Sequence, residues 1–224
     1  LLKGKLRMCG IVGYYSNNPN NESHIQDALK LLHHRGPDNS GYYSDGDLIL
    51  GHVRLSILDL SESGNQPFIS ADGKYVIVFN GEVYNFQEIK TKLEQEEVVF
   101  KSNSDTEVVL YSLIYYGTEK ALNLFNGMFS FTFYDIEKKE LIIARDRLGV
   151  KPLYYYKKGK ELLFASELKG IMKHSSFKKE FDQIMIDLGL GPSQTHQNSK
   201  NNEEEKANAT ARKVIDKNLS SAEK

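Results

Sequence analysis

Several kinds of residue are scarce in this sequence of 224 residues, and each scarcity excludes a class of protein. It contains one cysteine, Cys9, and no tryptophan. A single cysteine cannot form an internal disulfide, which excludes a disulfide-stapled domain and favours a reducing, cytoplasmic compartment. No stretch approaches about 18 consecutive apolar residues, so no membrane span is expected. The formal net charge of -1 lacks the basic excess typical of a nucleic-acid binder.

The residues that are present suit a globular protein. Hydrophobic residues make up 40% of the sequence, which is enough for a sizeable core, and the length suits one large domain or two small ones. Residues 1–7 are basic but lead into no apolar run of the signal-peptide type. Residues 193–213 contain no Val, Ile, Leu, Met, Phe, Tyr or Cys, so we expect 183–224 to be a polar, disordered tail.

Hydrophobic periodicity predicts the elements between these ends. Apolar residues that recur every three to four positions favour helices around 25–32, 86–93 and 109–116. Strands are expected at 10–15, 75–79, 129–133 and 153–156, with further apolar runs at 141–144 and 161–165, whereas residues 36–47, rich in glycine and aspartate, suggest loops and turns. Strands gather at the two ends with helices between them. This order favours an α+β fold over regular βαβ alternation.

The single cysteine stands in a context that allows catalysis. Cys9 follows Met8 and precedes Gly10. If translation starts at Met8 and the methionine is removed, Cys9 carries a thiol and an α-amine with a pKa near ~7.7, and the amine can accept the thiol proton. The alternative is an ordinary small buried hydrophobe at the start of a strand, which spacing alone favours.

Eight blocks along the chain decide between these interpretations. Together with the opening MCGIVG at 8–13, they resemble the class II glutamine amidotransferases, a branch of the N-terminal-nucleophile hydrolases, and 34–38 resembles the asparagine synthetase version. The blocks are HRGPD (34–38), HVRLSILD (52–59), GNQP (64–67), NGEVYN (80–85), SDTE (104–107), LFNGMF (124–129), RDRLGVKPLY (145–154) and FASE (164–167).

The resemblance implies a fold, a reaction and a set of site residues. The fold is a four-layer αββα sandwich with antiparallel sheets, and the reaction hydrolyses glutamine to glutamate and ammonia, which is passed to activated aspartate. Each part of glutamine needs a matching group: a bidentate donor for the carboxylate, acceptors for the ammonium and donors for the oxyanion. The resemblance assigns Cys9 as nucleophile; Asn80 and Gly81 as oxyanion hole; Arg54 with the backbone of Leu55, Ser56, Ile57 and Leu58 for the carboxylate; and Glu82 and Asp105 for the ammonium.

Several of these residues have structural alternatives. Arg54 could be a surface or paired arginine, and Asn80-Gly81 is a common hairpin-turn dipeptide. Asp105 could cap the following helix, in competition with Ser104 or Asn103. Adjacent histidines at 33 and 34 point about 100° apart on a helix and have no cysteine or carboxylate cluster beside them, so we expect no metal site.

The resemblance ends near Asp182, before the second domain of an asparagine synthetase. The Ser-Gly-Gly-x-Asp-Ser loop of that domain is absent from the sequence, so we expect no cofactor here; ATP and Mg would belong to the synthetase half. The expected organisation is a leader at 1–8, removed before Cys9, an amidotransferase domain at 9–182 and the tail at 183–224. Expected partners are L-glutamine and a synthetase domain or subunit, with neither nucleic acid nor membrane.

Two other functions stay open at this stage. One is an amidotransferase that serves another acceptor, against which the 34–38 block argues. The other is an inactive fragment that only binds glutamine or another subunit. A retained leader favours the inactive form, because an amide nitrogen at residue 9 has no basicity to accept the thiol proton.

Overall fold

The computed structural model describes residues 8–56 and 61–178. Residues 1–7 of the expected leader at 1–8 and the whole expected tail at 183–224 lie outside these described residues, as do two members of the expected carboxylate wall, Ile57 and Leu58.

Two antiparallel sheets form the centre of the molecule. The five-stranded sheet has the order β2-β3-β1-β9-β8, and the four-stranded sheet has the order β4-β5-β6-β7. Every strand pair in both sheets is antiparallel. The strands are β1 (Gly10–Tyr15), β2 (Asn39–Asp45), β3 (Leu48–Arg54), β4 (Phe68–Ile69), β5 (Tyr75–Val83), β6 (Gly127–Asp135), β7 (Glu140–Arg145), β8 (Tyr154–Lys158) and β9 (Glu161–Ala165).

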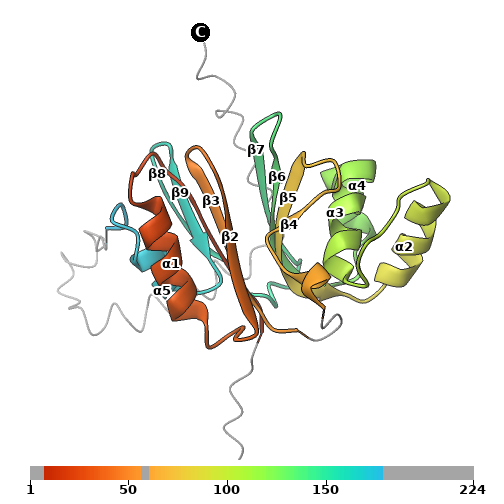
Figure 1. Cartoon of the computed structure of the whole chain (residues 1–224), viewed down its shortest axis with the longest axis horizontal. Helices are drawn as coiled ribbons and strands as arrows, with labels where there is room; N and C mark the ends of the chain where they lie inside the picture. The colour runs from red at the N-terminus through yellow and green to blue at the C-terminus, as the bar shows by residue number, and fades with distance from the viewer. Residues whose placement is uncertain (1–7, 57–60, 179–224) are drawn as a thin grey trace, which may run out of the picture.

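Helices cover the outer face of each sheet. Figure 1 shows α1 and α5 outside the five-stranded sheet, and α2, α3 and α4 outside the four-stranded sheet. The expected four-layer αββα sandwich of the α+β class is therefore confirmed. The helices are α1 (Asn21–Leu32), α2 (Phe86–Gln95), α3 (Asp105–Tyr116), α4 (Thr118–Leu124) and α5 (Leu168–Met172), and a short 3₁₀ helix spans Glu62–Gly64.

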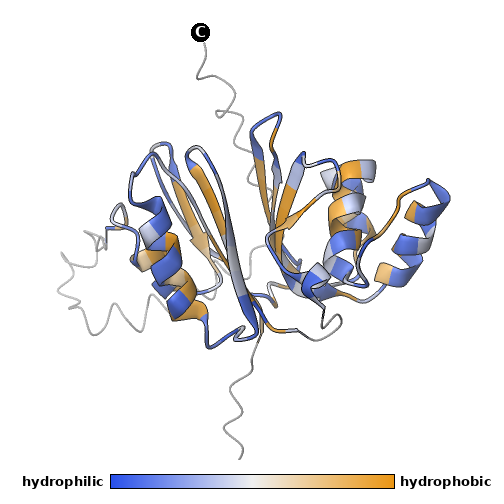
Figure 2. Ribbon diagram, viewed as in Figure 1, coloured by the Kyte–Doolittle hydropathy of each residue, from blue (hydrophilic) through white to orange (hydrophobic). Residues whose placement is uncertain are grey.

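The period of two along each strand distributes side chains between the layers. In β5, Ile77 and Phe79 pack into the core beneath α2 to α4, whereas Val76 and Val78 pack into the core between the sheets. In β1, Ile11 belongs to the core between the sheets, and its neighbour Val12 belongs to the core beneath α1. Figure 2 shows the resulting hydrophobic interior of the strands.

The same alternation carries polar residues toward the space between the sheets. Asn80 and Glu82 continue the row of Val76 and Val78 along β5. Arg54 continues the row of Leu48 and Leu50 along β3, and Cys9 lies two residues before Ile11. At this end of the sandwich the apolar layer between the sheets therefore gives way to chemically active side chains.

One sequence-based expectation was wrong, and one structural alternative is excluded. Residues 36–47 are not all loop, because Asn39–Asp45 forms β2, which pairs with β3. As an edge strand, β2 has exposed or half-buried side chains along its whole length. Its sequence therefore lacks the alternation of apolar and polar residues that would have predicted a strand. Asn80-Gly81 is not a hairpin turn, because both residues lie inside β5.

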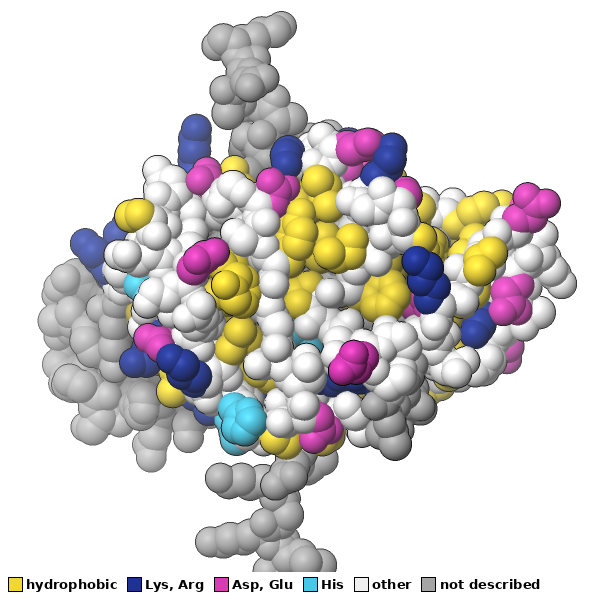
Figure 3. Space-filling model, in the orientation of Figure 1, with side chains coloured by type: hydrophobic (Ala, Val, Ile, Leu, Met, Phe, Trp, Pro, Cys, Tyr) yellow, Lys and Arg dark blue, Asp and Glu magenta, His cyan; other side chains and the backbone are white. Residues whose placement is uncertain are grey.

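The outer surface gives no sign of one dominant charge on the face in view. Figure 3 shows lysine, arginine and acidic side chains interspersed with hydrophobic ones over the described part of that face. Among the described residues, no helix has the length and hydrophobicity needed to cross a membrane.

Candidate active site

Cys9 lies immediately before β1 and against the chain that leaves β3. The backbone N–H of Leu55 donates to Sγ of Cys9 over 3.3 Å, and the thiol lies 3.6 Å from the Leu55 carbonyl oxygen. The strand register pairs Gly10 with Val53, which brings residue 9 level with the end of β3. The thiol is thus placed by sheet pairing rather than by a flexible loop.

Arg35 holds the backbone on both sides of the thiol. Its Nε donates to the carbonyl oxygen of Cys9 over 3.0 Å, and its own carbonyl oxygen accepts from the N–H of Met8 over 3.0 Å. The Arg35 guanidinium is itself fixed by a 3.0 Å ion pair with Glu167. Residues 34–38 and 164–167 therefore meet at Cys9, although they are far apart in the sequence.

Charged groups surround the thiol. Burial raises the pKa of Cys9, while the Leu55 N–H and the cations Arg54 and Lys151 act in the opposite direction. Asp105 adds a further raising effect. Because burial dominates, the thiol needs a nearby base before it can act as a nucleophile.

Asn80 has a side-chain donor that nothing in the described structure uses. The residue is 1% exposed, and its Nδ2 has no hydrogen-bond partner among the described residues. Buried amides normally find a partner, so an unpaired donor here calls for an explanation.

Gly81 lies where no side chain fits. A Cβ at this position would come within 2.4 Å of the Met128 carbonyl oxygen and 2.6 Å of the Phe129 Cα. These are backbone atoms of the paired strand β6 and cannot easily move. The pairing of β5 with β6 therefore requires glycine beside Asn80.

Asp105 begins α3 and faces the site from the helix layer. Its Oδ2 accepts from the N–H of Val83 over 3.0 Å. Burial, together with the nearby charge of Glu82, raises the pKa of Asp105 to about 6. The expected competition for the cap has an answer: Ser104 is the N-cap residue, and its hydroxyl accepts from the N–H of Thr106 over 3.2 Å.

Arg54, at the end of β3, is buried and held by the following loop. Its Nη1 donates to the carbonyl oxygen of Ser61 over 2.8 Å and to Oδ1 of Asn65 over 2.7 Å. The N–H of Ser56 donates to Oδ2 of Asp38 over 2.8 Å. The paired-arginine alternative thus describes part of its environment, and the fixed guanidinium also acts on the Cys9 thiol.

The structure brings together several of the residues named from the sequence. Arg54, Leu55 and Asp105 each interact with Cys9, and Glu82 interacts with Asp105. Asn80 and Gly81 share the strand with Glu82, and Ser56 continues from Leu55. For Ile57 and Leu58 the structure offers no test.

Lys151 was missed as a site residue. The sequence suggested only that 145–152 forms a structural turn near the pocket. In the structure the Lys151 side chain is buried and interacts with Cys9 and Glu82. A turn has no hydrophobic periodicity that could single out one of its residues. Only the place of Lys151 within the RDRLGVKPLY block could have drawn attention to it.

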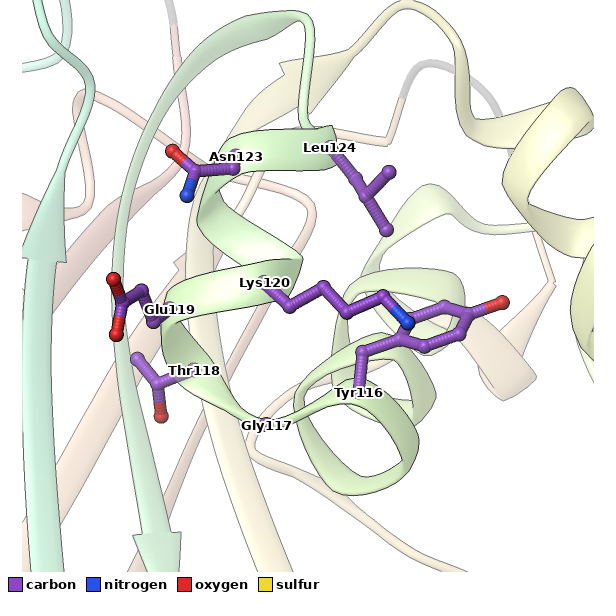
Figure 4. A pocket seen from close by; sticks show the side chains of 7 residues that line it. All are labelled: Tyr116, Gly117, Thr118, Glu119, Lys120, Asn123 and Leu124. Atoms are coloured by element: carbon purple, nitrogen blue, oxygen red, sulfur yellow. The ribbon is translucent and has the colours of Figure 1, made fainter.

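A hollow on the outer helix layer is separate from this cluster. It lies beside α4, where the Lys120 ammonium sits 4.7 Å from the centre of the Tyr116 ring (Figure 4). None of its lining residues belongs to the group around Cys9. It therefore contributes nothing to the interpretation of the thiol site.

Comparison with known proteins agrees with this geometry. The family described as glutamine amidotransferase domain matches residues 8–214. Asparagine synthetase [glutamine-hydrolyzing] 3 of Bacillus subtilis (strain 168) is 37% identical over 195 residues, which cover 84% of this chain and 31% of that protein. Amidase chry2 of Gibberella zeae is 39% identical over 179 residues, covering 74% of this chain and 26% of that protein.

Solved structures share the fold. Glutamine phosphoribosylpyrophosphate amidotransferase from B. subtilis superposes with a TM-score of 0.63 at 23% identity, covering 73% of this chain and 43% of that one. The chain spans about a third or less of the length of the two curated relatives named above. With its family match, its antiparallel αββα sandwich and its cysteine at the start of β1, the chain belongs to the class II glutamine amidotransferase domain family.

Proposed function

We propose that this chain is the glutaminase part of an asparagine synthetase, hydrolysing glutamine to glutamate and ammonia for transfer to activated aspartate. The observation that carries the proposal is the buried, unpaired Nδ2 of Asn80. Asn80 lies on the face of β5 that points to the space between the two sheets. A preorganised donor without a partner is what a developing oxyanion requires. An unpaired buried donor is costly, and hydrogen bonding to the oxyanion of the tetrahedral intermediate offsets that cost.

The proposed reaction uses Cys9 as the first residue of the active protein. Its α-amine takes the thiol proton, and the thiolate attacks the side-chain amide carbon of glutamine. The Asn80 amide and the Gly81 N–H stabilise the oxyanion. The α-amine then gives this proton to the leaving nitrogen, which departs as ammonia. Water hydrolyses the resulting thioester to glutamate and free thiol.

The remaining residues are proposed to hold the rest of glutamine. Arg54 is the donor for the α-carboxylate, with the backbone of Leu55 and Ser56 beside it; Ile57 and Leu58 complete that wall in the proposal. For the α-ammonium the proposed acceptors are Asp105 and Glu82.

Support for aspartate as the acceptor comes from the 34–38 block and from relatives. Asparagine synthetase 1 of B. subtilis is 41% identical over 170 residues. In this proposal the synthetase part, with its ATP and Mg, lies on another domain or subunit, and the reaction takes place in the cytoplasm. Amidases among the relatives favour a second candidate, an amidotransferase domain that serves a different acceptor.

The test compares two proteins, one starting at Met8 and one that retains residues 1–7 behind a blocked cleavage point. Glutamate release is measured, and intact mass confirms the first residue of each. General-base assistance is worth about 10²–10⁴-fold in rate, so the protein that begins at Cys9 should exceed the other by that margin. Cys9→Ala, which opens little volume, is the inactive control. Equal rates with the leader attached would overturn the proposed base.

A further inference from the structure

The ammonium of Lys151 is buried beside residue 9. The residue is 6% exposed in the described structure, and its Nζ lies 3.5 Å from Sδ of Met8, the neighbour of Cys9 that is removed in the proposed active form. A thioether is a weak acceptor and compensates poorly for the water that a buried ammonium has lost. Burial accordingly lowers the pKa of Lys151, whereas the nearby Cys9 and Glu82 favour its charged form. Such a costly placement points to a role at the thiol.

The turn that carries Lys151 is held by contacts to its backbone. Oδ2 of Asp146 accepts from the N–H of Lys151 over 2.9 Å, and also from the N–H of Phe129 in β6 over 3.3 Å. Nε of Arg145 donates to the carbonyl oxygen of Lys151 over 2.6 Å, and its Nη2 donates to that of Gly149. Gly149 has a φ of +65°, a conformation that favours glycine. Substitution of the Lys151 side chain leaves all of these contacts in place.

We propose that Lys151 is a positioning residue of the glutaminase, whose fixed positive charge keeps the α-amine of Cys9 unprotonated and assists ionisation of its thiol. This inference rests on the proposed function for the amine, and on the structure described above for the thiol. The proposed role also gives a reason for the hydrogen bonds that hold the turn at 145–151, because they fix the position of the Lys151 charge.

The physical basis is the effect of a nearby cation on two titrating groups. A positive charge disfavours the protonated amine and favours the thiolate, so both groups lose their protons more readily. When the thiol proton passes to the amine, the electron pair stays on sulfur and Lys151 keeps its own protons. Lys151 acts by charge alone and forms no bond to the substrate.

Other charged groups lie around residue 9 and Lys151 on neighbouring elements. Arg54 at the end of β3 and Arg35 after α1 add positive charge, whereas Asp105 on α3 and Glu82 on β5 add negative charge. All of them stay in place when Lys151 alone is changed. A shift in the titration of residue 9 can then be assigned to Lys151.

The first test uses the fact that Cys9 is the one cysteine in the sequence, so alkylation by iodoacetamide reports this thiol alone. The rate is measured against pH in the full chain and in Lys151→Met, Lys151→Arg and Lys120→Met. Lys120 is the matched control, because it lies on α4 above the Tyr116 ring and away from the site (Figure 4).

In Lys151→Met the midpoint of alkylation should rise by about one pH unit, which slows alkylation about tenfold below it. Lys151→Arg and Lys120→Met should keep the parent midpoint. An unchanged midpoint in Lys151→Met, or an equal shift in Lys151→Arg, would overturn the inference, because either result shows that charge is not the cause.

The second test follows glutamine hydrolysis in the chain that begins at Cys9. Loss of the cation makes the amine hold its proton more tightly, so the acid limb of kcat/KM should move up by about one pH unit in Lys151→Met and return in Lys151→Arg. If the parent hydrolyses glutamine but Lys151→Met has the parent's pH profile both for alkylation and for kcat/KM, the inference fails and the proposed function stands. If the parent does not hydrolyse glutamine, the proposed function fails, and alkylation still decides the effect of Lys151 on the thiol.

Discussion

At the scale of single residues, Arg54 is the clearest test of where glutamine binds. Its planar guanidinium is held by Ser61 and Asn65, and lysine cannot reproduce its fork geometry. We expect Arg54→Lys to raise the KM for glutamine, at a cost of about 1.5–3 kcal/mol for a lost charge-assisted contact. Steady-state glutaminase assays measure this directly.

The matched control for that variant is Arg147→Lys, an arginine whose Nη2 contacts Leu122 and Asn123 on the outer helix layer. Arg147→Lys should keep the parent KM. A parent-like KM in Arg54→Lys would show that the carboxylate binds elsewhere.

Asp105 predicts how glutamine binding depends on pH. Its pKa is raised to about 6 by burial, so the carboxyl takes up a proton and loses its charge as the pH falls through that value. The KM for glutamine should therefore rise below about pH 6, because a neutral carboxyl attracts the α-ammonium less. In Asp105→Asn the KM should be high at every pH and flat across this range. A parent KM that stays constant between pH 7 and pH 5 would contradict the prediction.

The raised pKa of Asp105 also predicts how the free energy of unfolding depends on pH. The folded protein binds this proton more tightly than the unfolded chain, whose carboxyl has the ordinary pKa of 3.8. The contribution of Asp105 to the free energy of unfolding therefore grows as the pH falls from about 6 toward 3.8. Comparing denaturant midpoints of the parent and Asp105→Asn over this range isolates the contribution.

At the scale of elements, β5 shows where local sequence and tertiary structure disagree. The apolar run at 75–79 predicted a strand, and the structure continues it to Val83. Asn80-Gly81 has strong turn preference by itself. It stays extended because β6 pairs with it residue for residue, with Asn80 opposite Ser130 and Gly81 opposite Phe129.

Gly81→Ala tests this tight pairing. The new Cβ would meet backbone atoms of β6 at 2.4 Å and 2.6 Å, so the strands must separate. Overpacking of this kind costs about 1–3 kcal/mol, and we expect the melting temperature to fall together with glutaminase activity.

Gly51→Ala in β3 is the matched control, since the atoms nearest to its Cβ would be side-chain atoms of Ile25 and Val12, at 3.1 Å and 3.2 Å. These side chains can yield by a few tenths of an ångström, so a smaller loss of stability is expected there. A Gly81→Ala protein as stable as Gly51→Ala would mean that β5 and β6 are less closely held than the structure indicates.

At the scale of the whole molecule, we propose that residues 9–182 form the folding unit and that 183–224 is a tail beyond it. The three buried hydrophobic clusters of the described residues run from Ile11 to Ile171. Deleting 193–224 should leave the melting temperature nearly unchanged, because that segment has few large apolar residues. A fall of several degrees on deletion, measured by calorimetry, would show that the tail takes part in folding.

The sequence by itself determined the fold class, most of the elements and a set of candidate site residues. Helices such as α1 follow from local hydrophobic spacing, and the eight blocks carried the family. The edge strand β2 was not predictable, because strand pairing joins residues distant in the chain and leaves little trace in an exposed strand.

Only the tertiary structure decided which groups share the space around the thiol. Alternation along β1, β3 and β5 sends Cys9, Arg54 and Asn80 toward the space between the sheets, but only the pairing and packing of the sheets and of α3 bring Arg54, Leu55 and Asp105 to the thiol. Lys151 reaches the same place from a turn, about 140 residues after Cys9 in the chain. Charge effects depend on distance in space, and this distance is set by the fold rather than by position in the sequence.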